Sequence, residues 1–112
     1  EYEEDDPADR ELTEICRYIR SHLSEQLTLE SIAGVFRISV SKLKLLFHKK
    51  MEMGVITYIN KQRIGKACEL IRNTPMKYTE IAEQLGFSSL HYFSRMFKKE
   101  TGMSPSEYAG KE

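Results

Sequence analysis

The fold of this 112-residue chain is decided by residues 81–99, whose sequence is IAEQLGFSSLHYFSRMFKK. On both sides of Gly86, apolar residues recur at the three- and four-residue spacing of an amphipathic helix. A glycine at such a place ends a helix readily, because it adopts the left-handed backbone conformation at little cost. The stretch therefore predicts a short helix, a tight turn and a longer helix that begins at Ser88, which is the helix-turn-helix pattern. Its inward side chains are expected to be Ile81, Ala82, Leu85, Phe93, Met96 and Phe97.

The same pattern occurs once more, about 50 residues earlier in the chain. Ile32-Ala33 precedes Ile81-Ala82 by 49 residues and Phe47 precedes Phe97 by 50, so the second copy has one extra residue near its turn. A plain helical bundle with an accidental similarity is the alternative. The repeat is favoured because a bundle does not need small residues at Ala33 and Ala82, where two short helices would cross closely.

The other segments also follow helical spacing, and proline is scarce. We predict an all-α fold of about seven helices, in which two helix-turn-helix subdomains are joined by a long linker helix. The expected parts are an acidic tail or linker stub at residues 1–8, a first subdomain at 9–53, the linker helix at 54–73 and a second subdomain at 74–112.

Local signals place the ends of these helices. The first helix is expected to start near Asp9, and Ser104-Pro105-Ser106-Glu107 is a capping box with proline at the first helical position. Thr28 and Ser39 are the expected N-caps of the two helices of the first copy. Inward residues are expected at Leu12, Ile15, Cys16, Ile19, Leu23, Leu29, Ile32, Ala33, Phe36, Leu43, Leu46 and Phe47, and in the linker helix at Ile56, Ile59, Arg63, Ala67, Leu70 and Ile71.

The formal net charge of zero hides an uneven distribution. Residues 1–14 hold eight acids and one base, so the other 98 residues carry a net charge of +7. A short acidic segment ahead of a basic body is typical of a body that binds a polyanion. Cys16 and Cys68 lie in apolar helical patterns and are interpreted as reduced core residues, which fits a reducing cytosol.

The exposed face of the second copy carries groups that can read DNA. Arg95 can donate two hydrogen bonds to guanine O6 and N7, His91 and Ser94 can bond base edges or phosphates, and Leu90 can pack on a thymine methyl group. Lys98 and Lys99 are expected at phosphates, where they give affinity without sequence information. The alternative for these two lysines is a solvated helix C-terminus.

The matching face of the first copy is basic, but it has no bidentate reader at its centre. Ser41 and Lys44 are its candidate base-reading residues, and Lys42, Lys49 and Lys50 are its candidate phosphate contacts. We expect this copy to contribute affinity more than sequence choice. A linker helix of about 20 residues is about 30 Å long, which is close to the distance of about 34 Å between successive major grooves on one side of DNA.

Residues 81–89 and 92–99, together with Gly102-Met103-Ser104-Pro105 and Tyr108, resemble the signature of the C-terminal DNA-binding domain of AraC/XylS-type transcriptional regulators. The resemblance covers nearly all of residues 9–109. It implies a bacterial regulator, more often an activator, that binds double-stranded promoter DNA and contacts RNA polymerase. It also implies a separate sensing or dimerisation domain, expected upstream. By position, the resemblance places Ser41, Lys44, Leu90, His91 and Arg95 at the bases.

The chain departs from the family pattern at several positions. Leu45 stands where many members place arginine, and Ala109 follows Tyr108 where arginine is common. Arg37 and Glu52 stand where the second copy has Gly86 and Gly102, so the first turn is expected to hold a non-glycine residue in an unusual conformation. Lys77 takes the capping position of Thr28, and lysine is a poor cap.

Two other classes of function are alternatives to DNA binding. A helical protein-interaction module could use the same basic face on an acidic partner. An enzyme is not predicted, because the sequence has no catalytic triad spacing, phosphate-binding glycine loop or metal-ligand cluster, and its three histidines are scattered. No cofactor, metal site or catalytic residue is therefore expected. The expected location is the cytoplasm, with the nucleoid, unless the full-length protein carries a membrane sensor.

Overall fold

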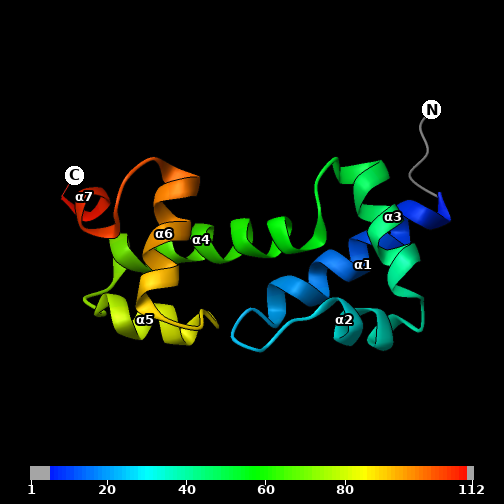
Figure 1. Cartoon of the computed structure of the whole chain (residues 1–112), viewed down its shortest axis with the longest axis horizontal. Coiled ribbons are helices and arrows are strands. Elements are labelled where there is room, and N and C mark those ends of the chain that lie inside the picture. The colour runs from blue at the N-terminus through cyan, green and yellow to red at the C-terminus, as the bar shows by residue number, and fades with distance from the viewer. Residues whose placement is uncertain (1–5, 111–112) are drawn as a thin grey trace. The chain divides into compact units, whose positions relative to one another are not determined.

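The computed structural model describes residues 6–110, and this part of the chain folds into seven α-helices without a β-strand. The all-α prediction with about seven helices is thereby confirmed. No helix in this range is long and apolar enough to cross a membrane. The helices are α1 (Pro7–Ser21), α2 (Leu29–Phe36), α3 (Val40–Met51), α4 (Val55–Asn73), α5 (Tyr78–Gln84), α6 (Leu90–Thr101) and α7 (Pro105–Ala109), as Figure 1 shows.

The described chain divides into two compact units. Unit 1 comprises residues 6–22 and Leu27–Ile59, and unit 2 comprises Leu23–Gln26 and residues 60–110. The long helix α4 therefore contributes its N-terminal part to unit 1 and its C-terminal part to unit 2, and the short segment between α1 and α2 belongs to unit 2. Of the acidic tail predicted at residues 1–8, residues 1–5 lie outside the described range.

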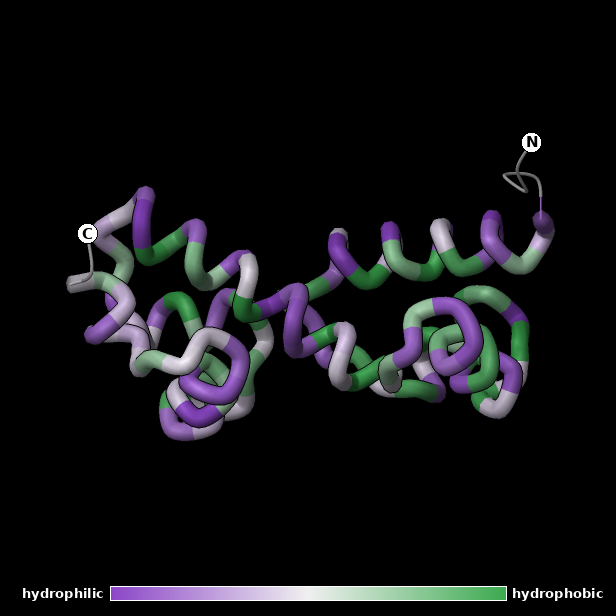
Figure 2. Tube along the Cα trace, turned by 90° about the horizontal axis from the view of Figure 1, so that it is seen from above, coloured by the Kyte–Doolittle hydropathy of each residue, from purple (hydrophilic) through white to green (hydrophobic). Residues whose placement is uncertain are grey.

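Helix α1 begins at Pro7, two residues before the predicted start near Asp9. The side chain of Asp6 accepts a hydrogen bond from the Ala8 backbone N–H at 2.9 Å, and proline occupies the first position of the helix, where it needs no donor. The hydrophobic positions of α1 lie along one side of the helix (Figure 2). Leu12, Ile15, Cys16 and Ile19 on that side are all buried, as predicted.

Unit 1 forms its core where α1, α2 and α3 pack on one another. Thr28 caps α2 by accepting from the Ser31 N–H at 2.9 Å, and Ser39 caps α3 by accepting from the Lys42 N–H at 3.0 Å, which confirms both predicted caps. Ile32, Leu43 and Phe47 are fully buried. The prediction for Ile56 is wrong, because this residue is 47% exposed and Val55 is buried in its place. In the first turns of α4 the buried stripe is formed by Val55, Tyr58 and Ile59, and Ile56 lies to one side of it.

Unit 2 packs α5 and α7 against α6, with the C-terminal part of α4 in the same core. Ile81, Phe93 and Phe97 are fully buried, and Met96 packs half-buried beside them. Helix α6 begins at Leu90, two residues later than the predicted start at Ser88, and Ser89 caps it by accepting from the Tyr92 N–H at 3.0 Å.

The two turns reach the same conformation with different residues. Arg37 has φ +57° and Gly86 has φ +82°, both in the left-handed region, so the predicted unusual conformation of Arg37 is confirmed. After the longer helices, Glu52 has φ +57° where Gly102 has φ +83°. Unit 1 therefore holds two side chains in a conformation that unit 2 gives to glycine.

Candidate nucleic-acid interface

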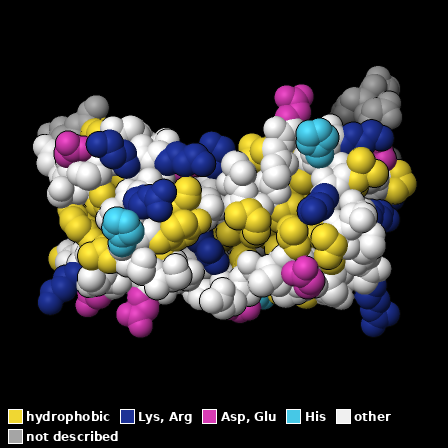
Figure 3. Space-filling model, in the orientation of Figure 1, with side chains coloured by type: hydrophobic (Ala, Val, Ile, Leu, Met, Phe, Trp, Pro, Cys, Tyr) yellow, Lys and Arg dark blue, Asp and Glu magenta, His cyan; other side chains and the backbone are white. Residues whose placement is uncertain are grey.

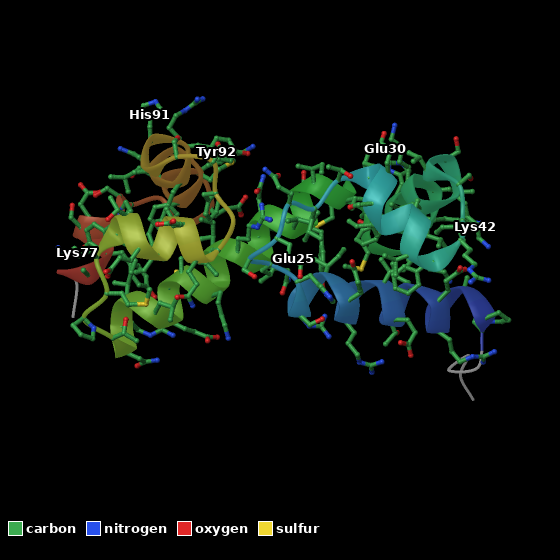
Figure 4. The ribbon with its side chains drawn as sticks, turned by 90° about the horizontal axis from the view of Figure 1, so that it is seen from below. Glu25, Glu30, Lys42, Lys77, His91 and Tyr92 are labelled. Carbon is green, nitrogen blue, oxygen red and sulfur yellow. The ribbon has the colours of Figure 1, made fainter. Side chains whose placement is uncertain are left out.

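Helix α6 is fixed by its buried side, and this decides which side chains face solvent. Phe93 and Phe97 fill the core at 0% exposure. On an adjacent side of the helix, Asn60 of α4 donates from Nδ2 to the Tyr92 hydroxyl at 3.4 Å. Residues three and four apart on a helix share a face, so the opposite face presents His91, Ser94, Arg95 and Lys98 together. Figure 4 shows His91 projecting outward from α6.

These side chains line one open hollow of about 490 Å³ on the surface of unit 2. Figure 3 shows cationic and histidine side chains beside hydrophobic ones over α6. Of the six residues predicted from the second copy, the hollow brings together all but Leu90, which is 41% exposed nearby on the first turn of α6. The hollow is lined by His91, Ser94, Arg95, Lys98, Lys99 and Ser104.

Ser104 was not among the predicted site residues. It is the N-cap of α7, and its hydroxyl accepts from the Glu107 N–H at 3.2 Å. The sequence showed its capping role but not that α7 packs against α6 and brings the cap to the edge of the hollow. Ser104 can be assigned to the hollow only once the packing of α7 against α6 is known.

The hollow is cationic, because Arg95, Lys98 and Lys99 line it and no acidic side chain does. Glu100, the one acid among the neighbouring residues of α6, lies instead in an ion pair with Lys61 of α4 at 2.8 Å, with its side chain only 14% exposed. Within residues 6–110, no ion pair involves Arg95, Lys98 or Lys99. These three cations are therefore available to a polyanion.

Helix α3 presents a second exposed face, formed by Ser41, Lys44, Leu45 and His48. Lys44 and His48 border a smaller hollow of about 370 Å³, whose other lining residues are Leu29, Gly54, Val55, Ile56 and Thr57. Ser41 and Lys49 are exposed but lie outside this hollow. The face combines cationic and apolar side chains and, unlike α6, has no arginine.

Two of the lysines predicted at phosphates are ion-paired within unit 1. Lys50 lies 3.0 Å from the Asp9 carboxylate and 3.4 Å from that of Asp6, and Lys42 lies 3.4 Å from Glu11. The hydrogen bond and charge of Asp9 raise the pKa of Lys50 above its usual value. Three acids of the segment counted in the sequence, Asp6, Asp9 and Glu11, therefore pair with lysines of α3, while Ser41 and Lys44 lie on the exposed face.

The described part of the chain holds no cluster of three or more histidine, cysteine or acidic side chains that could bind a metal ion. Cys16 is buried in unit 1 and Cys68 is half-buried against the core of unit 2, and both are free thiols.

The chain is similar in sequence to known proteins over most of its length. Residues 32–111 match the family described as "Helix-turn-helix domain". The arabinose operon regulatory protein of Escherichia coli K12 is 37% identical over 103 residues, which are 91% of this chain and 35% of that protein. The chain thus spans about a third of the length of the curated relatives it matches.

Solved structures show the same architecture. The C-terminal domain of AraT, a response regulator from Geobacillus stearothermophilus, superimposes with a TM-score of 0.88 at 34% identity, covering 96% of this chain and 87% of that one. The DNA-binding domain of AdpA, solved in complex with a target DNA, superimposes with a TM-score of 0.83 at 24% identity and covers 88% of each chain. At that identity the second likeness concerns the fold.

Proposed function

Because this chain belongs to the AraC-type helix-turn-helix DNA-binding domains of transcriptional regulators, which are not a class of enzymes, we propose that it binds double-stranded promoter DNA with α3 and α6 in successive major grooves. The observation that carries the proposal is the cationic hollow on α6. It gathers a bidentate donor, two shorter polar side chains and two lysines on one face of a helix whose other face is buried.

Within unit 2, the proposed roles follow from the position of each side chain along α6. Arg95 stands at the centre of the exposed face and donates two hydrogen bonds to a guanine. His91 and Ser94 bond neighbouring base edges, and Leu90 at the start of the helix packs on a thymine methyl group. Lys98 and Lys99, in the last turns, neutralise phosphates.

Within unit 1, Ser41 and Lys44 are the proposed base contacts and Lys49 the proposed phosphate contact. Lys42 and Lys50 have carboxylate partners on α1, so a phosphate would have to replace those partners. Of the three lysines of unit 1 predicted at phosphates, only Lys49 is therefore available to DNA without the loss of an ion pair.

The experiment that tests this function is selection of binding sites from random duplex DNA, followed by titration with the selected site. Arg95→Ala is expected to weaken binding by about 1–3 kcal/mol and to relax one base position. Arg95→Lys keeps the charge but loses the planar fork, so it should relax the same position. Lys66→Ala is the matched control, because it removes a cation that is exposed on α4 and paired with Glu69, away from the hollow.

The two-groove arrangement is tested by the spacing of the half-sites. Two recognition helices in successive major grooves on one side of the duplex require half-site centres about one DNA turn apart. Insertion of half a turn between the half-sites should therefore abolish high-affinity binding. Equal, weak affinity for all sequences would instead favour the protein-interaction module.

The partners of the whole protein are further parts of the proposal. The relatives are regulators about three times as long as this chain, so a sensing or dimerisation domain is expected upstream in the full-length protein. Contact with RNA polymerase is expected if the protein activates transcription, and its site of action is the bacterial nucleoid. Transcription in vitro with the full-length protein and purified polymerase tests whether the protein activates transcription through contact with the polymerase.

A further inference from the structure

Leu45 is an apolar side chain at the place where the other unit reads DNA. It lies on α3, and Arg95 follows it by 50 residues at the matching position of α6. Leu45 is 59% exposed, more than any other large hydrophobic residue that the structure describes. A single exposed leucine is ordinary on a protein surface, but this one lies on α3 at the position that matches Arg95 of α6.

The fold of unit 1 does not require this leucine. The inward side of α3 is already filled by Leu43, Leu46 and Phe47, which are all buried. Leu45 shares the opposite face with Ser41, one helical turn earlier, and Lys49, one turn later. Its hydrocarbon surface is therefore available to whatever ligand meets that face.

The charge of α3 indicates what the ligand is. The helix contains four lysines and a histidine and no acidic residue. Lys44, beside Leu45, and Lys49 are exposed, and neither has an ion pair within residues 6–110. Such a face fits a polyanion better than the apolar surface of a protein, and the apolar feature that duplex DNA offers in its major groove is the thymine methyl group.

We propose that Leu45 selects a thymine in the half-site of unit 1 by packing against its 5-methyl group. The inference rests on the proposed function and adds a base to it. A leucine placed against guanine or cytosine would cover polar base-edge groups without bonding them, which is unfavourable. The two units then read different chemistry, a methyl group by α3 and a guanine edge by Arg95 of α6.

The test uses DNA that differs by single methyl groups. In the selected site, each thymine is replaced in turn by deoxyuridine, which lacks only the 5-methyl group. One thymine in the unit 1 half-site is expected to lose about fourfold in Kd, the effect of one methyl group removed from contact. Leu45→Ala should bind thymine and deoxyuridine at that position equally.

Two further variants complete the design. Val35→Ala removes another exposed apolar side chain of unit 1, one that lies on α2, so it should keep the deoxyuridine effect at the thymine of Leu45. Leu45→Arg should select guanine in place of that thymine. Because Leu45 is exposed, both Leu45 variants are expected to fold, and their thermal unfolding is measured beside the DNA titrations.

The outcomes distinguish a failure of the Leu45 proposal from a failure of the proposed DNA-binding function. If Leu45→Ala keeps the loss at the same thymine, or if no thymine in the unit 1 half-site responds to deoxyuridine, Leu45 does not read a methyl group. If no sequence is selected from random DNA at all, the proposed DNA-reading function fails first.

Discussion

The guanidinium group of Arg63 lies so close to Gly86 that a Cβ atom at position 86 would be 2.8 Å from the Nη2 atom of Arg63. The same atom would be 2.7 Å from the carbonyl oxygen of Leu23. Arg63 is 8% exposed and donates from Nε to Leu23 O at 3.1 Å and from Nη2 to Glu25 O at 2.8 Å. Burial lowers its pKa, and the two carbonyl groups and the Phe87 ring, 5.8 Å away, take the place of water.

Gly86→Ala is therefore expected to cost more than a backbone conformation alone. Alanine at φ +82° costs about 1–2 kcal/mol, and displacement of the Arg63 hydrogen bonds adds about 1–3 kcal/mol. Gly102→Ala is the matched control, because Gly102 has φ +83° but nothing lies within 4 Å of a Cβ there. Urea unfolding should show the larger loss for Gly86→Ala. Equal losses would mean that the close approach has no energetic weight.

Arg37→Gly should stabilise the protein. The left-handed conformation of Arg37 at φ +57° costs about 1–2 kcal/mol, and glycine would remove this strain. Glycine also raises the entropy of the unfolded chain, which offsets part of the gain in stability. The expected net effect is a gain of about 0.5–1 kcal/mol in the free energy of unfolding. Glu52, also at φ +57°, offers a parallel substitution to glycine. A loss of stability for both variants would show that these side chains make compensating contacts.

The repeat, the helix content and the caps at Thr28 and Ser39 could be predicted because they depend on residues close in sequence. The exposure of Ile56 could not, since a helical period does not show that the buried stripe in the first turns of α4 runs through Val55 and Tyr58 instead. The start of α6 was predicted at Ser88 but lies at Leu90, because two adjacent serines leave the cap undecided and the path of the turn places Ser89 there. Sequence spacing alone cannot decide such cases.

The candidate site followed the same division. The periodicity of α6 predicted five of the six residues that line its hollow, since one helix face holds them. It missed Ser104, which packing between helices supplies. The pairing of Lys50 with Asp9 was also hidden, because a charge count shows an acidic segment but not its partner. Arg63 was expected in the inward stripe, but its acceptors are backbone carbonyl groups, which no residue pattern reveals.

Acid should weaken unit 2 through Glu107. Its carboxylate accepts the Ser104 backbone N–H at 2.8 Å, and hydrogen bonding to the Ser104 backbone and side chain lowers the pKa of Glu107 below 4.5. A carboxyl group with a lowered pKa stabilises the fold above its unfolded pKa, and this contribution is lost as pH falls through the folded value. The free energy of unfolding should therefore decrease as the pH falls below about 4.5.

Glu107→Gln tests this dependence. At neutral pH the variant should be less stable than the parent, and the two curves of unfolding free energy against pH should converge in acid, because protonated glutamate and glutamine are both neutral. Urea titrations at a series of pH values measure this. Parallel curves over the whole range would show that the Glu107 carboxylate contributes nothing that depends on its charge.

Lys49 and Lys50 are adjacent in α3, but we expect Lys49 to bind a DNA phosphate and Lys50 to stabilise unit 1. Lys50 lies between the carboxylates of Asp6 and Asp9, whereas Lys49 is exposed and has no ion pair within the described range. Each lysine that neutralises a phosphate on duplex DNA contributes about 0.9 to the slope of log K against log salt concentration. Lys49→Gln should lower the magnitude of that slope by about 0.9 and weaken all sequences alike.

Lys50→Gln should leave the slope unchanged and reduce the stability of unit 1, because it removes the cation that neutralises the start of α1. Fluorescence anisotropy titrations at several salt concentrations, with urea unfolding of each variant, separate the two effects. If Lys50→Gln lowers the slope as much as Lys49→Gln does, Lys50 must exchange its carboxylates for a phosphate on binding. In that case Asp9→Asn, which loosens the competing pair, should tighten DNA binding, and an unchanged Kd would leave the exchange without support.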